Sequence, residues 1–223
     1  MYSLFVGFWP GLHIIYDKYL TNIYDNQEVK EKIVRNAISF TNCIGTMLFC
    51  MCYYITQNEI LFNLLTIIPL MFYIYDTYFI LNKKLVNEYN YIIHHILTIV
   101  YFEKVYLVYH QHRNELLTIL FMLEISNIPI YLVYHMLQEL KLEPDNIKLQ
   151  NKLYTLKKIQ LGIYGPLRII YVPYFFHKHQ ELFPRSAELL AILFYMIGCY
   201  WFSNQCLHFI KNSKKNIKDI KDK

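Results

Sequence analysis

Long apolar runs separated by short polar segments dominate the sequence. A bilayer core requires roughly 20 consecutive apolar residues for each spanning helix, and most of these runs approach that length. The pattern therefore predicts an all-α, polytopic membrane protein with six transmembrane helices. The six runs cover residues 36–56, 60–81, 91–109, 115–137, 159–176 and 187–210.

Two segments depart from this pattern. The fifth run carries a Gly165-Pro166 pair, which predicts a broken helix whose freed backbone groups are satisfied by neighbouring helices. Residues 1–16 have Pro10 and Gly11 near their centre and lack a basic leader and a small-residue cleavage site. We therefore expect an interfacial segment here rather than a signal peptide, with a seventh transmembrane helix as the alternative.

Composition agrees with a single membrane-embedded unit. Hydrophobic residues make up 55% of the chain, which has only six glycines and seven prolines, so disordered and low-complexity classes are excluded. The five cysteines show no metal-binding or disulfide spacing and are interpreted as packing residues. The expected organisation is an N-terminal interfacial segment at 1–32, a transmembrane domain at 33–212 and a lysine-rich cytosolic tail at 213–223.

Basic residues are distributed unevenly along the chain. With six spans, 17 of the 22 lysines and arginines fall on the side that holds both termini and the loops after the second and fourth spans. The positive-inside rule then places both termini in the cytosol. The net charge of +5 sits largely in the tail, where we expect attraction to anionic lipid headgroups and no nucleic-acid partner.

A small set of polar side chains interrupts the apolar runs. A charged group at the centre of a spanning helix costs roughly 2.5–3.5 kcal/mol on insertion scales, so such groups are candidates for function. The set consists of Asp76, His94, His95, Thr98, Glu103, Lys104, Glu124, Ser126, Asn127 and Arg168.

Helix geometry suggests how these residues are arranged. Asp76 and His95 are expected to be neighbours, because at ~1.5 Å per residue both lie roughly 6–8 Å below the cytosolic interface. His94 and His95 point about 100° apart, so one ring is expected to act and the other to support it. Asp76 would orient His95, and the Thr98 hydroxyl would orient His94. A neutral imidazole held in this way suits a general base or an acyl-accepting nucleophile, and with Glu124 deeper the set predicts a cavity opening to the cytosol.

Simpler explanations exist for several of these residues. Buried His, Asn and Ser side chains also join membrane helices without any chemistry. Arg168 is expected to pair with Glu124, or alternatively with a lipid phosphate. Glu103 and Lys104 are adjacent opposite charges that neutralise each other or extend to the interface.

Four further histidines fall on two loops of the non-cytosolic side, where they would have to meet to bind a metal. We interpret them as exposed histidines and predict no metal site. They are His110, His112, His177 and His179.

Two short motifs resemble those of the TLC domain family, which includes the ceramide synthases. "HHILT" at 94–98 is similar to the family's His-His-x-x-Thr motif, and "EISN" at 124–127 lies where the family has an acidic-x-Ser cluster. The resemblance covers roughly 33–212 and is closest to small TLC-domain-containing proteins. The ceramide-synthase pattern His-Asp-x-Ser-Asp is replaced here by "LEISN".

The resemblance implies a barrel of six helices around a lipid-sized central cavity, located in the endoplasmic reticulum. It assigns catalytic roles to His94 and His95, places Glu124 in the acidic position, and makes Ser126 and Asn127 supporting residues. The expected function is to bind, sense, remodel or traffic membrane lipids. The alternative is a lipid acyltransferase that takes acyl-CoA as co-substrate and has no other cofactor. The sequence leaves the lipid and the oligomeric state open.

Overall fold

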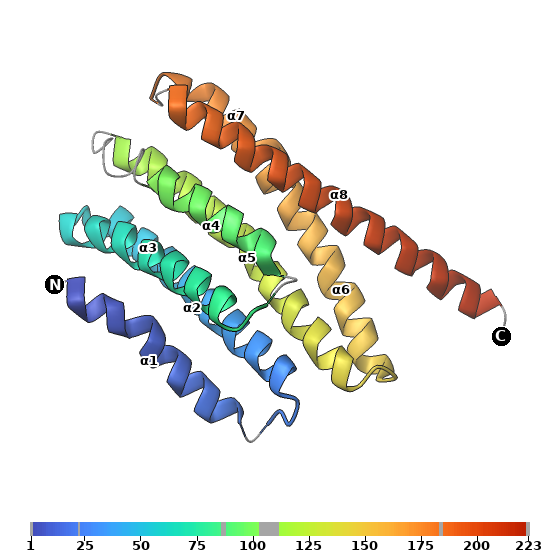
Figure 1. Ribbon diagram of the computed structural model, residues 1–223. Helices are drawn as coiled ribbons and strands as arrows, with labels where there is room; N and C mark the ends of the chain where they lie inside the picture. The colour runs from blue at the N-terminus through green and yellow to red at the C-terminus, as the bar shows by residue number, and fades with distance from the viewer. Residues whose placement is uncertain (1, 22, 86–87, 103–111, 183–184, 222–223) are drawn as a thin grey trace.

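The computed structural model describes residues 2–21, 23–85, 88–102, 112–182 and 185–221. These residues form helices and short connections, with no strand among them. The helices lie side by side and alternate in direction along the chain (Figure 1). They are α1 (Tyr2–Leu20), α2 (Gln27–Thr56), α3 (Glu59–Asn82), α4 (Tyr89–Tyr101), α5 (Arg113–Leu142), α6 (Ile147–Tyr164), the π-helical η4 (Gly165–Tyr171), α7 (Val172–Lys178), the 3₁₀ turn η5 (Gln180–Leu182) and α8 (Arg185–Lys221).

Four of these helices are long and apolar enough to cross a membrane: α2, α3, α5 and the segment Glu188–Ile210 of α8. The prediction of an all-α chain is confirmed, and these four helices are compatible with membrane spans; the count of six or seven spans stays a prediction. In its described part α4 has 13 residues, or about 20 Å at 1.5 Å per residue. The remainder of its apolar run, with Glu103 and Lys104, lies outside the described residues, and so does the following His110.

The fifth apolar run forms a continuous, irregular helix instead of the broken helix that the Gly165-Pro166 pair predicts. α6, η4 and α7 follow one another without a break in the chain, and η4 begins at this pair. Proline has no backbone N–H, so it removes one helical hydrogen bond and favours a local change of helix type. The π-helical segment that results is a kind of irregularity often found at functional sites.

Asparagine side chains define where three of the helices begin. Asn26, Asn58 and Asn146 precede α2, α3 and α6, and each side-chain oxygen accepts a backbone N–H from the first turn. This capping satisfies donors that have no partner within the helix. α2 therefore begins nine residues before the apolar run that starts at 36, and this extra length brings Arg35 into the bundle.

The N-terminal helix α1 packs along α2 and α3. Its Trp9 is buried and the indole N–H donates to the Ile68 carbonyl at 3.3 Å. The Tyr16 and Thr41 hydroxyls lie 2.8 Å apart and share a hydrogen bond. The choice between an interfacial segment and a seventh span stays a prediction. At the other end of the chain, the expected tail from 213 continues α8 as helix to Lys221.

The best-packed region lies between α2, α3 and α5, whereas α8 forms the outer wall of the bundle. Buried residues such as Cys50, Leu65 and Leu117 make one continuous apolar cluster in the inner region. In α8, only 6% of the most apolar window is buried, and its C-terminal half extends beyond α6 (Figure 1). The space that α8 closes from outside contains the candidate site.

Candidate functional site: a polar cavity between α2, α4 and α8

A buried ion-pair network joins α2, α3 and the start of α4. Arg35 binds both carboxylate oxygens of Asp76, with Nε to Oδ1 at 2.7 Å and Nη2 to Oδ2 at 2.8 Å. Its Nη1 donates to Glu88 Oε2 at 3.1 Å, and the Tyr134 hydroxyl of α5 donates to Glu88 Oε1 at 2.9 Å. The guanidinium also lies over the Tyr91 ring, 4.9 Å from its centre. We call Arg35, Asp76 and Glu88 the Arg35 cluster.

His95 faces this cluster, as expected from the sequence. Its Nε2 lies 3.5 Å from Asp76 Oδ2, and its Nδ1 lies 3.2 Å from the Thr77 hydroxyl. The ring is 4% exposed and packs against Tyr73. Both nitrogens therefore have a polar neighbour on α3, which fixes the orientation of the ring. The prediction that Asp76 and His95 are neighbours is confirmed.

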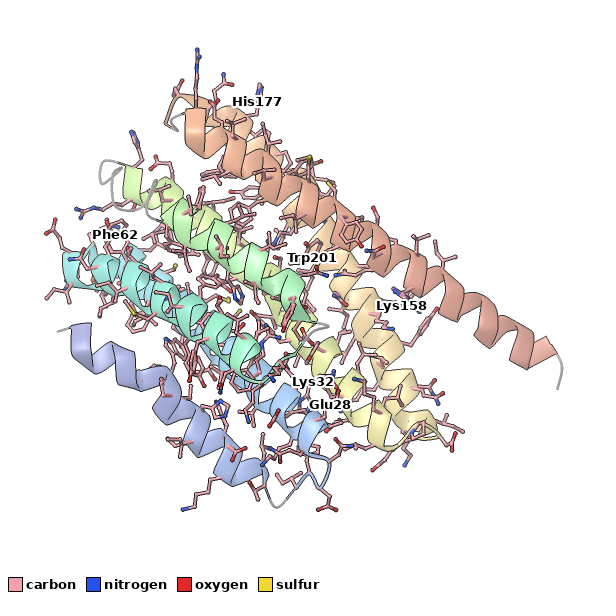
Figure 2. All side chains as sticks on the ribbon, in the orientation of Figure 1. Glu28, Lys32, Phe62, Lys158, His177 and Trp201 are labelled. Atoms are coloured by element: carbon pink, nitrogen blue, oxygen red, sulfur yellow. The ribbon has the colours of Figure 1, made fainter. Side chains whose placement is uncertain are left out.

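His94 points in a different direction, toward α8. Its ring centre lies 5.5 Å from that of Trp201 and 5.6 Å from that of Phe194. Trp201 projects from α8 toward the interior of the bundle (Figure 2). The Nδ1 atom of His94 is buried and has no hydrogen-bond partner among the described residues. The two adjacent histidines thus have separate environments, one held by a carboxylate and one among aromatic rings.

The expected role of Thr98 is wrong. Its hydroxyl donates to the backbone carbonyl of His94 at 2.8 Å rather than to the imidazole. A threonine in a helix commonly bonds the carbonyl four residues earlier, and that local bond competes with a side-chain partner. The His94 ring is therefore oriented by packing and not by a hydroxyl.

A cavity of about 300 Å³ connects these groups. Residues of α2, α3, α4, α5 and α8 line it, so it lies within the bundle and α8 closes one side. Its wall combines charged and amide groups with aromatic rings. The lining includes Arg35, Asn36, Ser39, Phe72, Tyr73, Asp76, Tyr91, His94, His95, Asn127, Tyr134, Trp201, Asn204, Gln205 and His208.

Arg168 holds a second polar group at the π-helical segment. Its Nε donates to Ser126 Oγ at 2.7 Å, and its Nη2 donates to Asn127 Oδ1 at 2.7 Å and to the Leu123 carbonyl at 3.1 Å. Asn127 in turn donates to Glu124 Oε2 at 3.1 Å. The expected direct ion pair between Arg168 and Glu124 is replaced by this bridge through Asn127, because the guanidinium fork is already occupied by α5 oxygens.

The structure brings most of the sequence-derived candidates to one region. Asp76, His94, His95 and Asn127 line the cavity. Glu124 and Arg168 stand behind Asn127 and hydrogen-bond its amide, and Ser126 accepts a hydrogen bond from Arg168. These supporting residues reach the cavity through Asn127.

Several residues of the cavity were not predicted from the sequence. Arg35 was assigned to the cytosolic loops, yet it is 8% exposed and at the centre of the ion-pair network. Val29, Ile33, Val34 and Ile38 surround it at helical spacing and are all buried, a pattern that could have extended the predicted helix. On α8, the residues Trp201, Gln205 and His208 follow the spacing of one helix face, which is the corresponding signal there.

No group of three or more His, Cys, Asp and Glu side chains is placed to hold a metal ion within the part of the chain that the structure describes. His112 precedes α5, while His177 lies in the last turn of α7. Figure 2 shows His177 at the end of the bundle where α7 meets α8. These histidines contribute nothing to the cavity.

Comparison of the chain with models of protein families, with curated proteins and with solved structures gave no match. The similarity to the TLC domain family therefore rests on the two short motifs alone.

Proposed function

We propose that this chain is a multi-pass membrane protein that binds the polar part of a lipid in the cavity between α2, α4 and α8, and thereby senses, remodels or traffics that lipid. The observation that carries the proposal is the composition of the cavity wall. Arg35, Asp76 and Asn127 offer charged and amide groups there, while Phe72 and Trp201 offer aromatic surface. A space of about 300 Å³ is at the lower end of the usual ligand-binding range, which suits a headgroup better than a whole lipid.

The proposed topology has six spans from α2 to α8, with the start of α2 and the C-terminus in the cytosol, and the TLC resemblance suggests the endoplasmic reticulum. α1 begins at the opposite end of the bundle (Figure 1), so the expected cytosolic location of the N-terminus does not follow from this arrangement. The loops after α3 and α5 and the C-terminal end of α8 lie at the same end of the bundle (Figure 1). Eleven of the chain's 18 lysines lie in these segments or within two helical turns of them. This grouping supports a cytosolic location for that end, and the Arg35 cluster lies toward it.

The proposal is tested by filling the cavity. Ser39 lines it, and its hydroxyl donates only to the carbonyl of Arg35 one turn earlier on the same helix. Ser39→Phe therefore occupies the space without removing an interhelical bond. Ser203→Phe makes the same change on an exposed position of α8 and serves as the control.

Each protein is purified in mild detergent, and the lipid that remains bound is measured by mass spectrometry. Wild type and Ser203→Phe are expected to retain the same lipid in near-stoichiometric amount, and Ser39→Phe is expected to lose most of it. Equal retention by the two variants, with both folded by thermal unfolding, would refute lipid binding in this cavity.

One observation favours a second candidate, an acyl-CoA-dependent acyltransferase. The buried Nδ1 of His94 has no partner among the described residues, and its ring lines the cavity. In this reaction an imidazole nitrogen attacks the thioester carbonyl, the C–S bond breaks, and coenzyme A leaves as its thiolate. A lipid amine or hydroxyl then attacks the acyl-imidazole, the C–N bond breaks, and the acceptor's proton is taken up by the thiolate or His95.

Lipid analysis of cells expressing wild type, His94→Phe or the His94→Ala/His95→Ala variant at equal folded levels separates the two candidates. An acylated lipid that rises with wild type and disappears in both variants would establish the transferase. If all three proteins leave the acylated lipids alike, the transferase is refuted in that host and the binding function stands alone.

A further inference from the structure

A second hollow lies between α5, α6 and α8, with a volume of about 330 Å³. We call it the α6–α8 groove. Its apolar wall includes Ile130 and Val133 of α5 and Leu161 of α6, and its polar wall includes Lys157, Gln160 and His208. No acidic residue is among the described residues that line it.

Lys157 is the distinctive residue of this groove. It is half-buried, and no carboxylate lies within ion-pair distance of it among the described residues. A lysine that faces apolar surface without an internal counter-ion is stabilised by an external anion. The amide of Gln160 adds a hydrogen-bond donor on the same wall. The local charge therefore suits a phosphate group.

The position of Lys157 on its helix suits a lipid rather than a soluble anion. Leu161 follows it one turn further along α6, on the same face, and Ile130 lines the same part of the groove from α5. Since α6 starts at the lysine-rich end of the bundle, Leu161 lies deeper than Lys157. A molecule with a phosphate near Lys157 and hydrocarbon next to Leu161 is oriented like a phospholipid of that leaflet.

The groove and the cavity are adjacent and share part of their walls. Tyr134, Gln205 and His208 line both. The Oε1 atom of Gln205 is buried and has no partner among the described residues. This oxygen is therefore free to accept a hydrogen bond from a ligand that lies between the groove and the cavity. α8, the least buried of the candidate spans, forms the outer wall of both spaces.

We infer that the α6–α8 groove is the lateral entrance through which an anionic phospholipid of the lysine-rich leaflet reaches the cavity, with its phosphate bound by Lys157. This inference rests on the proposed lipid-binding function and adds the class of lipid and the route of entry. It predicts selectivity for net negative headgroups, because Lys157 has no internal carboxylate to neutralise it.

The test uses the two tryptophans of the chain. Trp201 lines the cavity. The substitution Trp9→Phe leaves Trp201 as the single source of tryptophan fluorescence. The full chain is placed in phosphatidylcholine nanodiscs that contain a minor fraction of phosphatidylserine or phosphatidylcholine with brominated acyl chains, which quench nearby indoles. Brominated phosphatidylserine is expected to quench Trp201 several-fold more than brominated phosphatidylcholine at equal fraction.

Lys157→Gln is expected to remove this preference, and Lys157→Arg is expected to keep it. Lys158→Gln is the matched control, since Lys158 carries the same charge on the next residue, is exposed, and lies over the Tyr154 ring at 4.5 Å instead of lining the groove. Equal quenching by the two lipids in the Trp9→Phe protein that keeps Lys157 would overturn the inference. A loss of preference in Lys158→Gln as large as that in Lys157→Gln would also overturn it, because it would show general surface attraction.

The failure of this inference and the failure of the proposed function have different signatures. If Ser39→Phe loses its co-purified lipid while Trp201 shows no headgroup preference, the groove inference alone is refuted. If Ser39→Phe retains its lipid, lipid binding in the cavity is refuted, and the groove no longer serves as its entrance.

Discussion

Arg35 of α2 and Asp76 of α3 form a bidentate ion pair inside the bundle, with both N–O distances at or below 2.8 Å. The side chains are 10% and 3% exposed. A planar guanidinium matches the two carboxylate oxygens, so this pair fixes the rotation of α2 relative to α3. Because His95 contacts the same carboxylate, the pair also sets the geometry of the cavity wall.

Asp76→Asn is expected to destabilise the protein by about 3 kcal/mol, because removing one member of a buried pair leaves the other charge poorly compensated. The free energy of unfolding is measured by denaturant titration in detergent micelles. Glu59→Gln provides the control, since Glu59 forms a similar pair with Arg113 at 3.1 Å but is 76% exposed. Its loss is expected to be about 0–1 kcal/mol. Equal losses for the two variants would contradict a structural role for the Arg35–Asp76 pair.

The two adjacent histidines are expected to respond differently to replacement by phenylalanine. His95→Phe removes the contacts with Asp76 and Thr77 and should cost about 1–3 kcal/mol, because buried polar groups lose their partner. His94→Phe should cost much less, since Nδ1 of His94 has no partner to lose and its ring already packs against aromatic neighbours. Thermal unfolding of the two variants measures this difference. A larger loss of stability for His94→Phe than for His95→Phe would refute the conclusion that only His95 is held by polar partners.

Much of the helical arrangement could be predicted because apolar runs of bilayer length leave few alternatives. The proximity of Asp76 and His95 followed from their similar depth on consecutive helices. Arg35 was not placed in this way, because it lies outside the apolar run on which the spans were drawn; the helical spacing of Val29, Ile33 and Ile38 was the signal that extends the helix over it. Its burial depends on the Asn26 cap, which starts α2 nine residues earlier than the run.

The partners of Arg168 illustrate a second limit of prediction from sequence. Charge alone favours a pair with Glu124, the acidic residue at similar depth. The choice of Ser126, Asn127 and the Leu123 carbonyl instead depends on the π-helical turn at η4, which sets the direction of the guanidinium. The Gly165-Pro166 pair predicts an irregular turn there, but the type of turn depends on packing against α5 and α8.

Arg168→Lys is expected to weaken the contact between η4 and α5. An ammonium group cannot reproduce the three donor contacts of the guanidinium fork, so we expect a loss of about 1–3 kcal/mol. Arg185→Lys makes the same substitution at the exposed start of α8. It should have little effect on stability, because an exposed side chain has few contacts to lose. The unfolding free energies of both variants are compared in the same detergent. A loss below that of Arg185→Lys would show that the Arg168 contacts contribute nothing to stability.

Gly165 is expected to be needed for the close approach of α8 to the π-helical segment. A Cβ at Gly165 would lie 3.0 Å from Cζ of Phe202, whereas a Cβ at Gly162 would meet nothing within 4 Å. Glycine in a helix interior is less stable than alanine by roughly 0.5–1 kcal/mol. Gly162→Ala should therefore stabilise the protein by that amount, and Gly165→Ala should fail to do so because Phe202 has to move.

A double-mutant cycle with Phe202→Ala isolates this effect. Once the ring is removed, Gly165→Ala should recover its helix-propensity gain, so the cycle should give a coupling energy of about 0.5–1 kcal/mol. The parallel cycle of Gly162→Ala with Phe202→Ala should be additive, since the two side chains are not in contact. Coupling in both cycles, or in neither, would contradict a specific contact between Gly165 and Phe202. In that case α8 would not be held at this position, and its role as a fixed outer wall of the cavity would lose its structural basis.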